Sequence, residues 1–320
     1  MLPEFELLMP RTLPEALDML AGGTTTVTPL AGGTSLLVDM RGGSARGGCG
    51  RSPTEPPPAV AGLRPSHLPV LMDLAGLDEL HSIRQEDGHI VVGSGVAIAE
   101  LLDDPLIAQY ASVLRQAAAS FANPLVRNRA TLGGNLAYGS PAADTAPPLL
   151  VLGAEVELAS KAGRRRVPLE DFWAGVRQTV RRPDELLTTI RWPVPSPHSA
   201  SAFHKLALRK ADAISVVNAA VLVEYLETRF FPENLVSSVP APTCRQVRIA
   251  LGAVAPRPIR AHAAEDALCN RPLTPEAIAE AARLAAETTS CIDDVRGSAG
   301  YRQRVTEVLV RRLLGNQVFS

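Results

Sequence analysis

The sequence is poor in the residue patterns that mark metalloproteins and nucleic-acid binders. Its four cysteines (Cys49, Cys244, Cys269 and Cys291) form no C-x-x-C pair, and its six histidines form no H-x-x-x-H pair. These spacings match neither a zinc site nor a set of iron–sulfur ligands, so we interpret the cysteines as reduced thiols of a cytoplasmic protein. Aromatic residues make up only 4%, which argues against a stacking surface for single-stranded nucleic acid.

An excess of charge and a long apolar run are also missing. Lysine plus arginine (32) nearly equals aspartate plus glutamate (33), so neither nucleic acid nor an anionic membrane would be attracted in bulk. We expect no membrane span and, because acids and prolines occupy the N-terminal residues, no signal peptide. The sequence contains no G-x-S-x-G motif, so it gives no support to a serine hydrolase. The 320 residues, 46% hydrophobic and 20% charged, are typical of a soluble globular protein with two or three lobes.

The chain is organised around a loop with two glycines, residues 29–36 (PLAGGTSL). It follows a β-branched run at residues 24–28 and precedes an apolar, helix-like segment. A glycine N–H can approach an anion closely, and Thr34 and Ser35 add hydroxyl donors. The pattern predicts a phosphate-binding loop. An ordinary turn between a strand and a helix is the alternative interpretation.

A second loop of this kind, residues 131–135 (TLGGN), lies about 100 residues further along the chain. Two such loops would grip one diphosphate from opposite sides, with hydroxyl and amide donors from Thr131 and Asn135. Phe121, ahead of this loop, would cover an aromatic ring, and Asp144 would accept from sugar hydroxyls. The alternatives are core packing for Phe121 and a helix cap for Asp144.

A third glycine pattern lies at residues 93–98 (GSGVAI), between a predicted strand and a predicted helix. It nearly matches the dinucleotide fingerprint G-x-G-x-x-G, with Ile98 in place of the third glycine. This match supports a second hypothesis, a stand-alone Rossmann-type nicotinamide-dependent dehydrogenase that would use Gly93 and Gly95. A structural turn is the alternative, because isoleucine is bulky where close packing needs glycine.

Periodicity predicts the elements of the remaining chain. Residues 41–69, rich in Gly, Pro, Ser and Arg, are expected to form a flexible insertion or a linker. We expect solvated turns at the three arginines of residues 164–166 and at the two arginines of residues 181–182. We expect Lys205 and Arg209 to lie on a strand that faces solvent. We expect helices at residues 13–21, 106–120, 169–174, 258–268, 275–287 and 300–314, and strands at 70–74, 89–93, 155–159, 186–192, 202–208, 216–225 and 247–254.

Several segments together resemble a known protein family. They are PLAGGTSLL (residues 29–37), ATLGGNLAYGSPAADTAPPLL (130–150), FHKLALRKADAISVVNAAV (203–221), and VRIALGAVAPRPIRA (247–261) with DDVRGSAGYR (293–302). The chain resembles, over nearly its whole length, the FAD-binding medium subunit of molybdenum hydroxylases such as carbon monoxide dehydrogenase and xanthine dehydrogenase. The resemblance implies an α+β fold, in which a two-lobed FAD-binding (PCMH-type) α/β domain precedes a C-terminal α+β domain with a small antiparallel sheet. It implies lobes at residues 1–58 and 59–195 and the C-terminal domain at 196–320.

The resemblance also implies which residues contact FAD. Both glycine loops would hold the pyrophosphate, and Lys205 would lie near the flavin ring instead of in solvent. No side chain would act as a catalytic acid or base, and no metal would bind. The implied FAD contacts are Pro29, Leu30, Ala31, Gly32, Gly33, Thr34, Ser35, Leu36, Phe121, Thr131, Leu132, Gly133, Gly134, Asn135, Asp144, Leu187 and Lys205.

The function implied by the resemblance is electron relay within a complex. A large molybdopterin-binding subunit oxidises the substrate, and a small subunit with two [2Fe–2S] clusters passes the electrons to FAD in this chain. The final acceptor would be NAD⁺, O₂, a quinone or another molecule. The implied assembly is a cytoplasmic dimer of heterotrimers, and the implied activity is that of an oxidoreductase.

Overall fold

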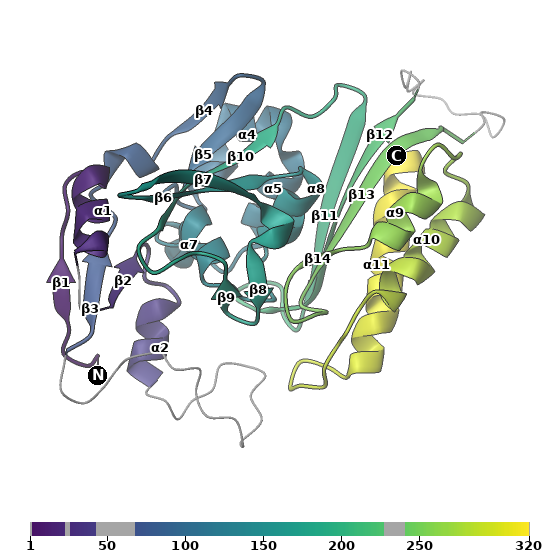
Figure 1. Ribbon diagram of the computed structural model, residues 1–320. Coiled ribbons are helices and arrows are strands. Elements are labelled where there is room, and N and C mark those ends of the chain that lie inside the picture. Colours follow the sequence, from purple (N-terminus) through teal and green to yellow (C-terminus); the bar gives the residue numbers. More distant parts are fainter. Residues whose placement is uncertain (1, 23–25, 43–67, 227–240, 320) are drawn as a thin grey trace.

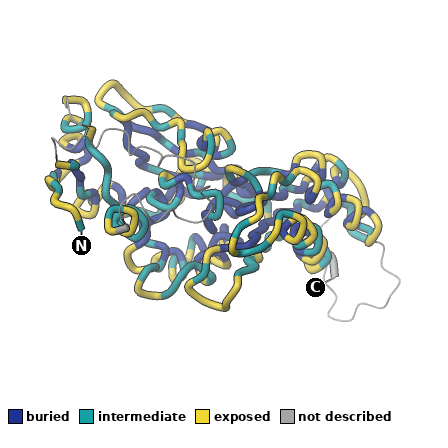
Figure 2. Tube along the Cα trace, turned by 90° about the horizontal axis from the view of Figure 1, so that it is seen from below, coloured by how far each residue is buried: buried dark blue, intermediate teal, exposed yellow. Residues whose placement is uncertain are grey.

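The computed structural model describes residues 2–22, 26–42, 68–226 and 241–319. These residues form an elongated molecule in which the three larger sheets follow one another from the N-terminal to the C-terminal side (Figure 1), and β8 and β9 form a small fourth sheet. Buried segments run through its middle, whereas exposed segments lie mostly in outer turns and helix faces (Figure 2). The insertion expected at residues 41–69 lies almost entirely outside the described residues.

The N-terminal lobe is a parallel sheet in the order β1-β3-β2, covered by the helix α1. The hydroxyl of Thr12 accepts a hydrogen bond from the Glu15 amide and caps α1, which confirms the helix predicted at residues 13–21. Leu13 and Ala16 on the inner face of α1 are buried. The elements are β1 (Glu6–Leu8), α1 (Leu13–Ala21), β2 (Val27–Leu30), α2 (Leu36–Gly42) and β3 (Val70–Asp73).

The pairing of β3 bears on the first domain boundary. The predicted boundary between residues 58 and 59 lies outside the described residues. Because β3 follows it in sequence and pairs with both β1 and β2, the first lobe continues through this strand. Met72 of β3 and Leu80 beyond it belong to the same buried cluster as Leu13.

The second lobe is an antiparallel sheet in the order β4-β5-β10-β6-β7, with several short helices packed around it. Its core includes Ile90, Ile98, Leu132 and Trp192, all fully buried. The lobe contains η2 (Asp78–Leu80), β4 (Ile83–Glu86), β5 (His89–Gly93), α3 (Glu100–Asp103), α4 (Pro105–Tyr110), α5 (Ser112–Ser120), α6 (Pro124–Arg127), α7 (Leu132–Ala137), α8 (Ala146–Val151), β6 (Glu155–Ser160), β7 (Gly163–Pro168), η3 (Leu169–Asp171), β8 (Trp173–Gly175), β9 (Gln178–Thr179) and β10 (Leu186–Pro193).

Three local predictions in this lobe were wrong. The helix predicted at residues 106–120 is two helices, because the buried Ala111 has a non-helical backbone (φ −146°, ψ 45°) that interrupts the helix. The segment 169–174 forms a single 3₁₀ turn and then a strand. The arginine triplet lies in β7, where Arg165 forms two hydrogen bonds to the buried Glu185. In each case packing overrides local propensity.

The C-terminal domain is an antiparallel sheet in the order β11-β12-β13-β14. Three helices cover one face (Figure 1), whereas α5 and α8 of the second lobe pack on the other. Burial on both faces explains the almost uninterrupted apolar run of β12. The predicted strands and the helix at 275–287 are confirmed. The elements are β11 (Ser199–Ala207), β12 (Ser215–Tyr225), β13 (Cys244–Gly252), β14 (Ile259–Arg260), α9 (His262–Leu268), α10 (Pro275–Glu287) and α11 (Ala299–Phe319).

Candidate functional site

A cavity of about 500 Å³ lies between the N-terminal lobe and the second lobe, and both glycine loops line it. Of the predicted site residues, fourteen line this cavity: Pro29, Leu30, Ala31, Gly32, Gly33, Thr34, Ser35, Leu36, Phe121, Thr131, Gly133, Gly134, Asn135 and Leu187. The sequence places the two loops far apart, and the fold brings them together.

The backbones of the two loops touch. A Cβ atom added at Gly32 would lie 1.6 Å from the Arg129 carbonyl oxygen, ahead of the second loop. One added at Gly134 would lie 3.6 Å from the Cβ of Ala31. Only glycine therefore fits at position 32, because any side chain would push the two lobes apart.

The first loop brings backbone amides and hydroxyl-bearing residues to the cavity wall. Gly33 has φ +71°, a left-handed conformation that favours glycine and turns the chain into α2. Among the described residues, none accepts a hydrogen bond from the backbone amides of residues 32–35. The hydroxyl-bearing residues Thr34 and Ser35 line the cavity beside these amides. Successive free N–H groups in a turn form a concave site for an anion.

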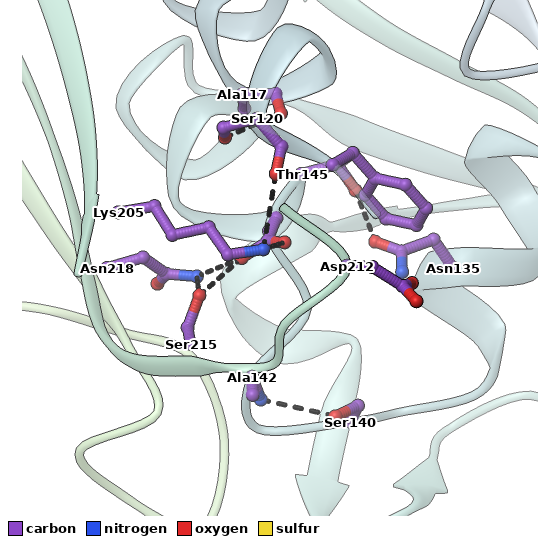
Figure 3. Close-up of polar contacts among 12 residues, drawn as sticks. Ala117, Ser120, Asn135, Ser140, Ala142, Thr145, Lys205, Asp212, Ser215 and Asn218 are labelled. Atoms are coloured by element: carbon purple, nitrogen blue, oxygen red, sulfur yellow. Dashed lines mark hydrogen bonds and ion pairs between the residues drawn. The ribbon is translucent and has the colours of Figure 1, made fainter. Parts of the chain in front are cut away.

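The second loop begins α7. The Thr131 hydroxyl accepts from the Gly134 amide at 3.0 Å and caps the helix. The side-chain oxygen of Asn135 accepts from the Thr145 hydroxyl at 2.6 Å (Figure 3). This bond fixes the orientation of the Asn135 amide and leaves its NH₂ group as a donor. Gly133 packs against Ser94, where a Cβ would lie 2.4 Å from that of the serine.

Three predicted site residues do not line the cavity. Leu132, the first residue of α7, is fully buried in the core of the second lobe. Asp144 and Lys205 form a buried ion pair at 2.5 Å, with side chains 8% and 7% exposed. The expectation from strand spacing alone, that Lys205 faces solvent, was wrong.

Asp144 is the centre of a buried polar network. Its Oδ1 accepts from the Ser215 hydroxyl at 2.6 Å and from the Asn218 amide at 2.9 Å. Lys205, Ser215 and Asn218 point toward one another in Figure 3. Lys205 also donates to the carbonyl of Ser120, the residue before Phe121. The network thus joins the C-terminal sheet to the segment that carries an aromatic residue into the cavity.

The structure does not favour a Rossmann-type site at Gly93–Gly95. The amides of Gly93, Ser94 and Gly95 donate to the carbonyls of residues 82, 188 and 80, so none is free to bind a pyrophosphate. The preceding strand, β5, lies in an antiparallel sheet, whereas the dinucleotide fingerprint needs a parallel βαβ unit. Gly93–Gly95 is a structural turn.

Sequence reasoning missed several residues of the cavity wall, among them Tyr138, Arg181 and Glu100. Arg181 was expected in a solvated turn. Its guanidinium instead donates to the carbonyls of Arg182 and Glu185, and burial lowers its pKa. No pattern around the arginine pair signals this placement, whereas Tyr138 follows the second loop closely enough to have been considered.

The described ranges contain no cluster of three or more His, Cys, Asp or Glu side chains that could hold a metal ion. Within the same ranges, no helix is long and apolar enough to cross a membrane.

Comparison with protein-family models gives two matches that cover most of the chain. Residues 60–195 match the FAD-binding domain in molybdopterin dehydrogenase. Residues 201–317 match the C-terminal domain of the carbon monoxide dehydrogenase flavoprotein. The first glycine loop lies ahead of the first matched range.

Similar proteins and structures agree with these matches. The putative xanthine dehydrogenase FAD-binding subunit of Escherichia coli (strain K12) is 30% identical over 78% of this chain and 81% of its own length. The carbon monoxide dehydrogenase medium chain of Hydrogenophaga pseudoflava is also 30% identical, with the same coverage. A solved structure of carbon monoxide dehydrogenase from Hydrogenophaga pseudoflava superposes with a TM-score of 0.82 at 30% identity, covering 98% of this chain and 97% of that one. Quinoline 2-oxidoreductase from Pseudomonas putida 86 gives 0.80 at 29% identity, covering 99% and 97%.

Proposed function

This chain belongs to the family of FAD-binding subunits of molybdenum hydroxylases, and on this premise we propose that the cavity between its two glycine loops binds FAD. The observation that carries the proposal is the contact of the two loops beside a row of amides from which no described residue accepts a hydrogen bond. When bound, FAD supplies the capacity to accept and pass on electrons.

The residues of the cavity fit a diphosphate. The amides of residues 32–35 and the hydroxyls of Thr34 and Ser35 would hold it from the first lobe. The NH₂ group of Asn135 would donate from the second lobe. The charged residues that line the cavity include the arginines at 129 and 181, with one acid at 100, which suits an anionic ligand.

We propose supporting roles for the site residues that lie outside the cavity wall. Lys205 fixes the Ser120 carbonyl and thereby the direction in which Phe121 enters the cavity. Asp144 holds Lys205, and the buried side chain of Leu132 anchors the first turn of α7. Phe121 and Leu187 supply the apolar surface against which a flavin or adenine ring would pack.

We propose that the chain relays electrons within a larger oxidoreductase. Its partners would be a large molybdopterin-binding subunit and a small [2Fe–2S] subunit, in a dimer of heterotrimers that delivers electrons to NAD⁺, O₂ or another acceptor. The relatives named as medium subunits support the partner proposal. The cytoplasmic location stays a prediction.

We further propose three structural units. The sequence predicts the first boundary at residues 58/59, whereas the pairing of β3 with β2 supports a boundary after Leu80. The second unit ends near residue 195, and the third includes residues 196–320.

The test is to purify the chain and measure bound FAD. We expect a yellow protein whose flavin absorption is bleached by dithionite and restored in air, and which co-purifies with a molybdopterin subunit and an iron–sulfur subunit. A folded protein that neither retains nor takes up FAD at micromolar concentration would contradict the proposal. Binding of NADH instead would revive the dehydrogenase hypothesis.

A further inference from the structure

Three side chains from separate parts of the chain meet beside the cavity. The Tyr138 hydroxyl donates to Asp39 Oδ2 at 2.9 Å, and Arg177 Nη1 donates to the same oxygen at 3.0 Å. The Arg177 guanidinium also lies over the Tyr138 ring, 4.6 Å from its centroid. Asp39 belongs to α2 of the N-terminal lobe, whereas Tyr138 caps the C-terminal end of α7 in the second lobe.

This cluster ties together the two helices that the glycine loops begin. The first loop runs directly into α2, and the second runs into α7. At one end of the pair, Gly32 packs against the Arg129 backbone. Tyr138 lies about 10 Å further along α7 from Thr131, given a rise of about 1.5 Å per residue. The first lobe therefore contacts the second lobe at two separate points beside the cavity.

The two helices frame the proposed diphosphate site. Both loops line the cavity, and Tyr138 lines it too. In Figure 1, α2 and the β8–β9 hairpin, which carries Arg177, both lie on the lower side of the molecule. Any widening between α2 and α7 would separate the donors of the first loop from those of the second.

Backbone contacts hold Arg177 next to Tyr138. Arg177 has φ +55°, and its amide donates to the carbonyl of Gly139, the residue after Tyr138. Gly139 has φ +65°, and a Cβ there would lie 3.0 Å from the Arg177 Cα. Burial raises the pKa of Tyr138 above its usual value, so its phenol remains a donor to the Asp39 carboxylate at neutral pH.

We propose that Asp39, Tyr138 and Arg177 are positioning residues that hold the two lobes at the spacing the cofactor needs and thereby slow its release. The inference rests on the proposed FAD site. It adds residues that none of the glycine motifs contains, and it gives the first lobe a second attachment beside the cavity.

The experiment compares the rate of FAD release from wild type, Tyr138→Phe, Asp39→Asn and the double variant. Release is followed by the rise in flavin fluorescence after dilution. Each single variant should release FAD about tenfold faster, which corresponds to about 1.4 kcal/mol. Tyr138→Phe removes only the bond to Asp39, whereas Asp39→Asn also removes the ion pair with Arg177, so the double variant should be scarcely faster than Asp39→Asn alone.

Asp18→Asn is the matched control. Asp18 of α1 and Lys161 form another ion pair between the lobes at 3.0 Å, and neither residue lines the cavity. Loss of this ion pair should leave the rate of FAD release unchanged. The melting temperature of each FAD-free protein shows whether a variant is folded. If Asp39→Asn does not fold, Arg177→Gln replaces it. Arg177→Gln should also increase the rate of FAD release, by a smaller factor.

The possible outcomes separate this inference from the function on which it rests. Wild type that binds no FAD would overturn both. Wild type that binds FAD, with folded Tyr138→Phe and Asp39→Asn variants that release it at the wild-type rate, would overturn the positioning role alone. Equal acceleration by Asp18→Asn would also overturn it, because any loosening of the lobes would then suffice.

Discussion

Substitution of Gly32 by alanine should separate the two glycine loops. The added Cβ would lie 1.6 Å from the Arg129 carbonyl oxygen and 2.5 Å from its carbon. Cβ atoms essentially never approach closer than 3.0 Å, and backbone on both sides cannot swing away as a side chain would. The loops would have to move apart by more than 1 Å.

The expected cost to FAD binding follows from the hydrogen bonds that this movement breaks. A hydrogen bond to a charged group contributes about 1.5–3 kcal/mol, and its strength falls steeply with poor geometry. Loss of one or two such bonds to the diphosphate gives about 3 kcal/mol. This is a loss of affinity somewhat above a hundredfold.

The assay is equilibrium titration of the FAD-free protein, followed by quenching of flavin fluorescence. Gly134→Ala should weaken binding less, because its Cβ would meet the Thr131 hydroxyl at 2.8 Å, and that side chain can rotate. Gly315→Ala, in α11 with nothing within 4 Å of the new Cβ, is the matched control. Folded Gly32→Ala protein with wild-type affinity would refute the reasoning that the loops grip one ligand.

Two further predictions concern buried and interfacial charges. Lys205→Met leaves the Asp144 carboxylate buried without its cation, so the free energy of unfolding should fall by about 3–5 kcal/mol in urea titrations; the added substitution Asp144→Asn should restore part of it. His262 on α9 contacts Glu170 of the second lobe at 2.6 Å, and also faces Glu265 and Arg260. The hydrogen bond to Glu170 raises the pKa of His262, so its stabilising contribution is complete below about pH 6.5 and is lost as the pH rises through the folded-state value. His262→Gln should remove this pH dependence of the melting temperature, and an unchanged pH profile would contradict the assignment.

Some features of this protein were determined by local sequence. Thr12 and the proline after it set the start of α1, and Thr274 caps α10 at the predicted residue. The apolar run at residues 216–225 predicted the strand β12, and the structure then showed that both of its faces are buried. The first glycine loop was expected between a strand and a helix, and it lies between β2 and α2. That the two loops bind a diphosphate stays a proposal.

Tertiary structure decided which of these signals share a site. Gly93 and Gly95 resemble a nucleotide-binding fingerprint, yet protein carbonyls occupy their amides, and no local pattern reveals that. Lys205 reads as a solvent-facing lysine until the fold places Asp144 beside it. The contact of Gly32 with Arg129 is likewise not visible in the local sequence. Such contacts join residues far apart in sequence, and their energies depend on packing and burial that exist only once the lobes have assembled.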